Sequence, residues 1–271
     1  MVDLRVLSLG AGVQSTTLAL MIEHGEVPMV DCGIFADTMA EPLNVYTHLD
    51  WLKKQVSFPI HIIHFGNLYK DVMSGATDGV FLEIPAYTKD KITQKKGLLF
   101  RQCTNHYKIQ PINKKVRELL GVGYKKRVPK NTKVEMLIGI STNEIQRTRR
   151  NKLPYIKNIY PLIDKNYSRN DCLKWMEKNN YPKPPRSACT FCPFHSNEEW
   201  KDIKKNKEEW DEVVALDKAI RHGTKKDREK NNTNEIFLHK SGVPLDEADL
   251  DPNKDQQDLF NDICDEGMCG V

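Results

Sequence analysis

The sequence predicts an α/β protein built on a doubly wound parallel sheet, with a helical, cysteine-bearing C-terminal part. Four apolar stretches of strand length occupy residues 4–9, 29–36, 60–65 and 134–140. Helical patterns separate the first three, and strands that alternate with helices are typical of a parallel sheet. Ligands on such sheets bind at the carboxyl ends of the strands, so the segments after each strand are the candidate site.

The first strand, Leu4–Leu9, leads into a glycine-rich turn with Gly10 and Gly12, and a buried helix is expected at residues 17–23. A strand, a glycine turn and a helix N-terminus together bind phosphate, because glycines let the backbone approach and the free amides face the anion. The turn has neither the Rossmann glycine spacing nor the Walker Gly-Lys-Ser/Thr ending. Alone, it is equally consistent with an ordinary tight turn.

The next elements extend this edge of the sheet. Asp37 and Thr38 close the second strand, so we expect them to share one site with the glycine loop. Residues 41–55 carry apolar side chains at helical spacing, and residues 103–120 are expected to be a helix that Pro111 bends or divides. Between them, residues 69–100 are polar and lysine-bearing, which predicts an excursion that covers the site.

Two basic clusters follow. One is a loop with Lys125, Lys126, Arg127 and Lys130, which is either a solvated surface or a contact for a polyanion such as nucleic acid. The other is Arg147, Arg149 and Arg150 after the fourth strand, where guanidinium groups suit phosphate or sulfate and simple solvation is the alternative.

The C-terminal part should be largely helical. Ser168 is an N-cap candidate for a helix at 171–178, and Ser196 for one that runs to about Arg221. Residues 223–234 are charged and polar, which indicates a mobile linker before an acidic tail. We therefore predict a nucleotide-binding α/β domain at 1–165, a helical Cys-x-x-Cys region packed on it at 166–222, and a linker with a flexible tail at 223–271.

The composition is that of an ordinary soluble protein, with 29% charged and 39% hydrophobic residues. The formal net charge of +4 is too mild to indicate nucleic acid by itself. No apolar run reaches the roughly 20 residues of a membrane span, and the N-terminus lacks a signal-peptide pattern. We expect a cytoplasmic protein that does not contact membranes, in which seven cysteines serve metal binding or catalysis before disulfides.

Cys189 and Cys192 form a Cys-x-x-Cys, whose spacing lets two thiolates grip one metal centre. Cys103 supplies a third thiol. These three could hold a [4Fe-4S] cluster with one iron open, or a zinc ion together with His195. In the remaining alternative, Cys103 is an unrelated thiol and the pair is structural.

The motifs in this order resemble the phosphoadenosine phosphosulfate (PAPS) reductase family of the PP-loop, or adenine nucleotide α-hydrolase, superfamily. Residues 8–15 are similar to its modified PP-loop, 37–42 to its Asp-Thr-Gly segment, 103–112 to its Cys-Cys-x-x-Arg-Lys-Val-x-Pro-Leu segment, and 160–164 to its Pro-Leu/Ile-Ile-Asp segment. Cys-x-x-Cys-Pro-Phe and the terminal Gly-Met-Cys-Gly-Val are similar to a phage and prophage subgroup.

The resemblance implies an enzyme that reduces PAPS or adenylylsulfate with a thiol donor protein and carries an iron–sulfur cluster on Cys103, Cys189 and Cys192. Cys269 would attack the sulfur and Cys264 would resolve the product. The residues implied to bind the nucleotide are Ser8, Gly10, Gly12, Gln14, Ser15, Thr16, Asp37, Thr38, Arg147 and Arg150.

Departures from the pattern leave alternatives open. Thr104 replaces the second cysteine of the Cys-Cys pair, and three ligands favour an ATP-dependent sulfurtransferase that thiolates a nucleobase or another carbonyl. Gln14, where the ATP-using enzymes have aspartate, and Cys269 favour the reductase, although the terminal histidine of the reductases is missing. A non-catalytic nucleotide-binding accessory protein is the third possibility.

Overall fold

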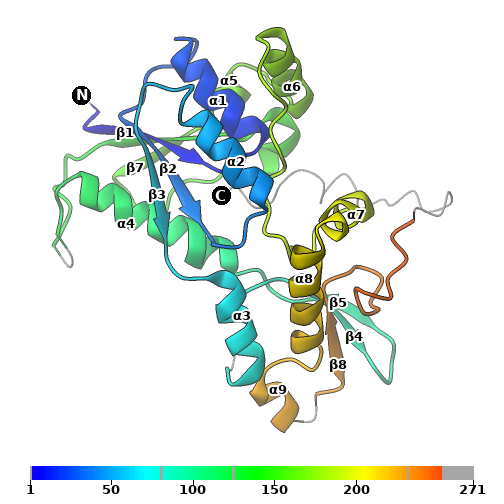
Figure 1. Ribbon diagram of the computed structural model, residues 1–271. Coiled ribbons are helices and arrows are strands. Elements are labelled where there is room, and N and C mark those ends of the chain that lie inside the picture. The colour runs from blue at the N-terminus through cyan, green and yellow to red at the C-terminus, as the bar shows by residue number, and fades with distance from the viewer. Residues whose placement is uncertain (1, 80–81, 124–125, 231, 252–271) are drawn as a thin grey trace.

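The computed structural model describes residues 2–79, 82–123, 126–230 and 232–251. Within them, five strands form a parallel sheet in the order β3-β2-β1-β6-β7 (Figure 1). The strands are β1 (Leu4–Leu9), β2 (Cys32–Asp37), β3 (Ile60–His64), β6 (Val134–Ile138) and β7 (Ile156–Ile159). The doubly wound parallel sheet is therefore confirmed, and β7, a four-residue strand, is the one the sequence pattern missed.

Helices cover both faces of this sheet. The core on one face contains side chains of α1 (Val13–Glu23), α2 (Leu43–Leu52), α5 (Pro161–Asp164) and α6 (Arg169–Lys178). The other face packs against α4 (Gln110–Leu119). Successive side chains of a strand point to opposite faces, so Leu7 lies in the first core and Val6 in the second. Burial on both faces explains why the strands read as continuous apolar runs.

The helix expected at residues 103–120 begins as a π-helix, η1 (Thr104–Ile109), and continues as α4. Pro111 lies in the first turn of α4, just after the helix changes type. Ile109 and Gln110 at this junction both have right-handed helical backbone angles, so the chain stays helical through Pro111 and the expected division amounts only to this change of helix type.

A second lobe lies beside the sheet in Figure 1. It contains α3 (Leu68–Thr77), α7 (Asn197–Lys205), α8 (Lys207–Ile220) and α9 (Lys225–Glu229), together with β4 (Tyr87–Asp90), β5 (Lys96–Leu98) and β8 (Asn234–Phe237). These strands form an antiparallel sheet in the order β5-β4-β8. An apolar core joins α3 to the C-terminal helices, with Trp200 and Leu216 fully buried in it.

Three expectations about this lobe are refined or corrected. Residues 69–100 leave the parallel sheet as the predicted excursion does, but they form α3, β4 and β5 of the second lobe. The linker prediction for 223–234 is wrong, because Thr224 forms a capping box for α9 and β8 then pairs with β4. The single helix after Ser196 is two helices, and Asn206 caps the second. Pairing over such sequence distances leaves no trace in local composition.

The other C-terminal expectations concern caps and the tail. Ser168 and Ser196 are both confirmed as N-caps, each in a capping box. None of the helices in the described ranges combines the length and apolarity that crossing a bilayer requires. The tail with Cys264 and Cys269, and Lys125 of the basic loop, lie outside the described residues.

Candidate nucleotide and cysteine site

The glycine loop after β1 is shaped by Ser15, whose hydroxyl accepts a hydrogen bond from the Gly10 N–H at 3.2 Å and donates to the Gly12 carbonyl at 3.3 Å. The N-cap residue of α1 is Gly12, which has no side chain to bond to the amides of the first turn. Amides at a helix N-terminus attract anions, both by hydrogen bonding and through the helix dipole. The loop from Gly10 to Ser15 therefore has the features of an anion-binding turn, and we refer to it as the cradle.

This cradle lies at the switch point of the sheet. β1 pairs with β2 on one side and with β6 on the other, so the strand order reverses between β1 and β6. Gly139, just after β6, touches the start of α1 so closely that a Cβ there would lie 2.8 Å from the backbone nitrogen of Ser15. Open α/β sheets bind ligands at the carboxyl edge at such a point.

Two loop residues make contacts that the sequence does not reveal. The Gln14 amide donates to the Glu144 carboxylate at 3.1 Å. Thr16 is fully buried, and its hydroxyl lies 3.0 Å from Nε2 of His48 on α2, away from the cradle. Burial lowers the pKa of His48 to about 4, so the ring is neutral at physiological pH.

The two arginines predicted to bind the nucleotide, Arg147 and Arg150, lie in different environments. Arg147 forms an ion pair with Glu144, whose side chain is buried, and Glu144 also holds Gln14. The structure thus joins Arg147 to the glycine loop through one carboxylate. Arg150 is exposed, beyond the end of the 3₁₀ helix η2 (Thr142–Arg147).

The end of β2 connects the cradle to the cysteines. Asp37 accepts hydrogen bonds from the Met39 N–H at 2.7 Å and from the Tyr46 hydroxyl at 2.8 Å. Burial and the Asp37 carboxylate raise the pKa of Tyr46, which keeps this donor protonated. The hydroxyl of Thr38, which is buried, lies 3.2 Å from Sγ of Cys189.

The Cys-x-x-Cys is a tight turn in which the Cys192 N–H donates to the Cys189 carbonyl at 2.9 Å, and both residues are buried. Just before it, Ser187 lies 3.6 Å from the position of a Cβ on Gly12. Cys103 is half-buried at the start of η1, and it packs against the same apolar core as Cys189.

Three polar residues, His195, Arg186 and Glu199, support the Cys-x-x-Cys turn. Nε2 of His195 lies 2.9 Å from the Cys189 carbonyl, and Nδ1 lies 3.5 Å from the Glu199 carboxylate. Arg186 pairs with Glu199 and donates to the Phe194 carbonyl. Burial alone would raise the pKa of Glu199, but His195 and Arg186 lower it to about 2. The His195 ring nitrogens thus face a carbonyl and a carboxylate.

An ion pair on a buried carboxylate, which the sequence did not reveal, ties three segments together. Glu41, after β2, has a fully buried side chain and pairs with Lys108 of η1 at 3.1 Å. The Ser187 hydroxyl also donates to Glu41 at 3.4 Å. Glu41 therefore fixes the β2 end, the segment that follows Cys103 and the approach to Cys189 relative to one another.

The other described cysteines have a different character. Burial raises the pKa of Cys32 to about 11 and that of Cys172 to about 12, so both are unreactive core thiols. Over the described ranges, no group of three or more His, Cys, Asp or Glu side chains is arranged to hold a single metal ion.

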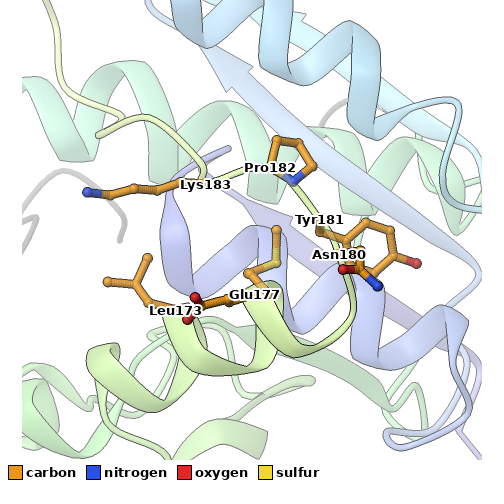
Figure 2. Close-up of a pocket in the computed structure, with 7 residues that line it drawn as sticks. Leu173, Glu177, Asn180, Tyr181, Pro182 and Lys183 are labelled. Atoms are coloured by element: carbon orange, nitrogen blue, oxygen red, sulfur yellow. The ribbon is translucent and has the colours of Figure 1, made fainter.

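A separate pocket of about 700 Å³ lies between α6 and the proline-rich segment after it (Figure 2). Its lining includes Glu177, Tyr181 and Lys183. Tyr181 stacks on Trp175 with ring centroids 6.0 Å apart and bonds through its hydroxyl to His24. The same segment reaches the glycine loop four residues later, where the Pro185 carbonyl lies 3.9 Å from a Cβ position on Gly12.

No protein-family model matches the chain, and no curated protein sequence matches it. One similar solved structure is a phosphoadenylyl-sulfate (PAPS) reductase from Candida auris in complex with phosphate. It is 15% identical, and the match covers 67% of this chain and 75% of that chain with a TM-score of 0.38.

Proposed function

We propose that the chain is a PP-loop adenine-nucleotide enzyme of sulfur metabolism that resembles PAPS and adenylylsulfate reductases. The observation that carries this proposal is the 3.2 Å contact between Thr38 and Cys189. Thr38 follows β2 at the edge where an α/β sheet binds its ligand, and Cys189 belongs to the metal-type Cys-x-x-Cys. The candidate nucleotide site and the candidate sulfur or metal site are therefore adjacent.

The glycine-loop amides would bind the 5′-phosphosulfate, with Ser15 holding the loop and Arg147 adding positive charge nearby. The Cys269 thiolate would attack the sulfur and break its bond to the phosphate oxygen, so that the adenine nucleotide leaves and a thiosulfonate remains on Cys269. A second thiol, such as Cys264, would then displace sulfite and leave a disulfide. A thiol donor protein would reduce that disulfide for the next turnover.

Cys103, Cys189 and Cys192 would hold the iron–sulfur cluster. Thiolates are the ligands that such clusters take, and Cys103 and Cys189 pack against one apolar core. Bound there, the cluster would supply electrostatic tuning of the site. Nε2 of His195 lies 2.9 Å from the Cys189 carbonyl and is not free to bind zinc, which favours the three-thiol set over a zinc set that uses this nitrogen.

An ATP-dependent sulfurtransferase is the second candidate, and the same contact favours it. A three-cysteine cluster bound at this turn would supply sulfur through its open iron. That sulfur would replace the oxygen of a carbonyl activated by adenylation, with AMP as the leaving group, and the C-terminal cysteine would not be needed. Release of pyrophosphate from ATP would mark this activity.

Anaerobically purified protein tests the proposal. Metal analysis and an absorbance spectrum would report the cluster, and turnover would be assayed with PAPS, adenylylsulfate or ATP. The reductase predicts sulfite from a sulfonucleotide plus thiol donor, and Cys269→Ser should abolish it while the surface variant Lys126→Gln leaves it unchanged. Pyrophosphate without sulfite would favour the sulfurtransferase. If neither sulfite nor pyrophosphate forms, the non-catalytic accessory protein is favoured.

A further inference from the structure

The β4–β5 hairpin, residues 87–101, is strongly basic for its size. It carries one carboxylate, Asp90, and five basic residues: Lys89, Lys91, Lys95, Lys96 and Arg101. Asp90 is occupied inside the hairpin, where it accepts hydrogen bonds from the backbone of Ile92 and Thr93 and from the Thr233 hydroxyl. The carboxylate thus shapes the turn, and the lysines determine the charge that a partner meets.

The charge of this hairpin is only partly compensated within the fold. Lys91 lies 3.4 Å from the Glu235 carboxylate. Lys96 instead donates to the Ser241 carbonyl at 3.0 Å, and a neutral acceptor leaves the ammonium charge in place. Lys95 is exposed at the turn beside it. The uncompensated charge therefore gathers at the start of β5.

Apolar side chains interleave with these lysines. Phe100 and Ile92 are the most exposed large apolar residues in the described chain, at 79% and 78%, and Leu98 is also exposed. Ile92 belongs to the turn and Phe100 follows the far end of β5, so the apolar groups are spread along the hairpin and not gathered at its tip. A lipid-inserting loop would concentrate them at the tip.

The hairpin leads directly to the cysteine site. The Leu99 N–H donates to the Ala86 carbonyl and the Cys103 N–H donates to the Glu83 carbonyl, which fixes Phe100 between these two anchors. An exposed aromatic ring therefore lies three residues before Cys103, in the lobe that stands beside the parallel sheet (Figure 1).

We propose that this hairpin is a contact surface for single-stranded nucleic acid, with Lys95 and Lys96 facing phosphates and Phe100 stacking on a base. Spaced lysines and an exposed aromatic ring are the two components of sequence-tolerant single-strand binding. The basic loop at residues 126–130 is a different surface. It lies between α4 and β6, before the amino end of that parallel strand.

Binding of a labelled oligothymidylate to the full-length protein, measured by fluorescence anisotropy over a series of salt concentrations, tests the proposal. Lys95→Gln/Lys96→Gln should weaken binding and lower the slope of log affinity against log salt by about 1.4, because each phosphate contact on a single strand adds about 0.7. Phe100→Ala should weaken binding about tenfold, as loss of one stacked base does, with the salt slope unchanged.

The matched control is Lys126→Gln/Lys130→Gln, which removes the same charge from the other basic loop and should leave the affinity unchanged. Equal losses in both double variants, or no oligonucleotide binding by the wild type at low salt, would overturn the proposal. Binding to anionic phospholipid vesicles that depends on Phe100, with oligonucleotide binding independent of it, would overturn it in favour of a membrane contact.

Discussion

The glycine loop and the Cys-x-x-Cys turn both lie near the carboxyl ends of the parallel strands, but they are shaped over very different sequence distances. The Ser15 hydrogen bonds that form the loop join residues three and five positions apart. Cys189 and Ser187 are held by Thr38 and Glu41, across 151 and 146 residues. The loop is therefore encoded locally, whereas the cysteine turn depends on the completed fold.

One of the two largest expected effects comes from the ion pair that supports the cysteine side. Glu41→Ala should lower the free energy of unfolding by about 3 kcal/mol, because it removes the fully buried carboxylate that pairs with the largely covered Lys108 ammonium. Urea denaturation measures this loss, and Glu41→Ala/Lys108→Met should recover part of it. Glu118→Ala, which breaks the solvent-exposed pair with Lys115, is the control and should leave stability nearly unchanged.

The packing around the glycine loop is tested most directly at Gly139. A Cβ there would overlap the Ser15 backbone at 2.8 Å, so Gly139→Ala should cost about 3 kcal/mol in an unfolding titration. Gly10→Ala is the matched control, since its Cβ would meet only the Ser15 hydroxyl at an ordinary 3.7 Å. Similar losses in the two variants would contradict the close contact between β6 and α1.

Glu199, which supports the Cys-x-x-Cys turn, should make the free energy of unfolding depend on pH. Its folded pKa of about 2 lies below its ordinary value of 4.5, so the stabilisation is complete above pH 4.5 and is lost as the pH falls toward 2. Glu199→Gln should therefore lower the unfolding free energy by about 2 kcal/mol at pH 7 and by much less at pH 3. An equal deficit at both pH values would show that charge is not the cause.

The smallest effects should come from the two serine caps, one in each region. Ser168→Ala and Ser196→Ala should each cost about 1 kcal/mol, because each removes the side-chain acceptor of a capping box. Urea denaturation of both variants compares them directly. A clearly larger loss for Ser196→Ala would indicate that its cap also holds Glu199 in place below the cysteine turn.

These distances also explain what the sequence could predict. Apolar periodicity located four of the five described strands of the parallel sheet, and Ser168 and Ser196 were recognisable because a cap acts within its own first turn. The second lobe was not recognisable, because β8 pairs with β4 across more than 140 residues. The short β7 carries too few residues to show a period.

In the candidate site too, local features could be predicted from the sequence and long-range contacts could not. Glycine spacing indicated the loop, and cysteine spacing indicated a metal-type turn. The contacts of Thr16 with His48 and of Gln14 with Glu144 were hidden, because the partners come from other elements. Glu41, Arg186 and Glu199 carried no signal, since an isolated charged residue usually lies on the surface.

The central claim is that the glycine loop binds an adenine nucleotide beside the cysteine turn. Calorimetric titration of the full-length protein with adenylylsulfate and PAPS tests it most directly, with Gly10→Val to fill the cradle and Lys130→Gln as the surface control. We predict saturable binding that Gly10→Val weakens at least about tenfold and Lys130→Gln leaves unchanged. Failure of the wild-type protein to bind either nucleotide, or equal affinity in Gly10→Val, would contradict it.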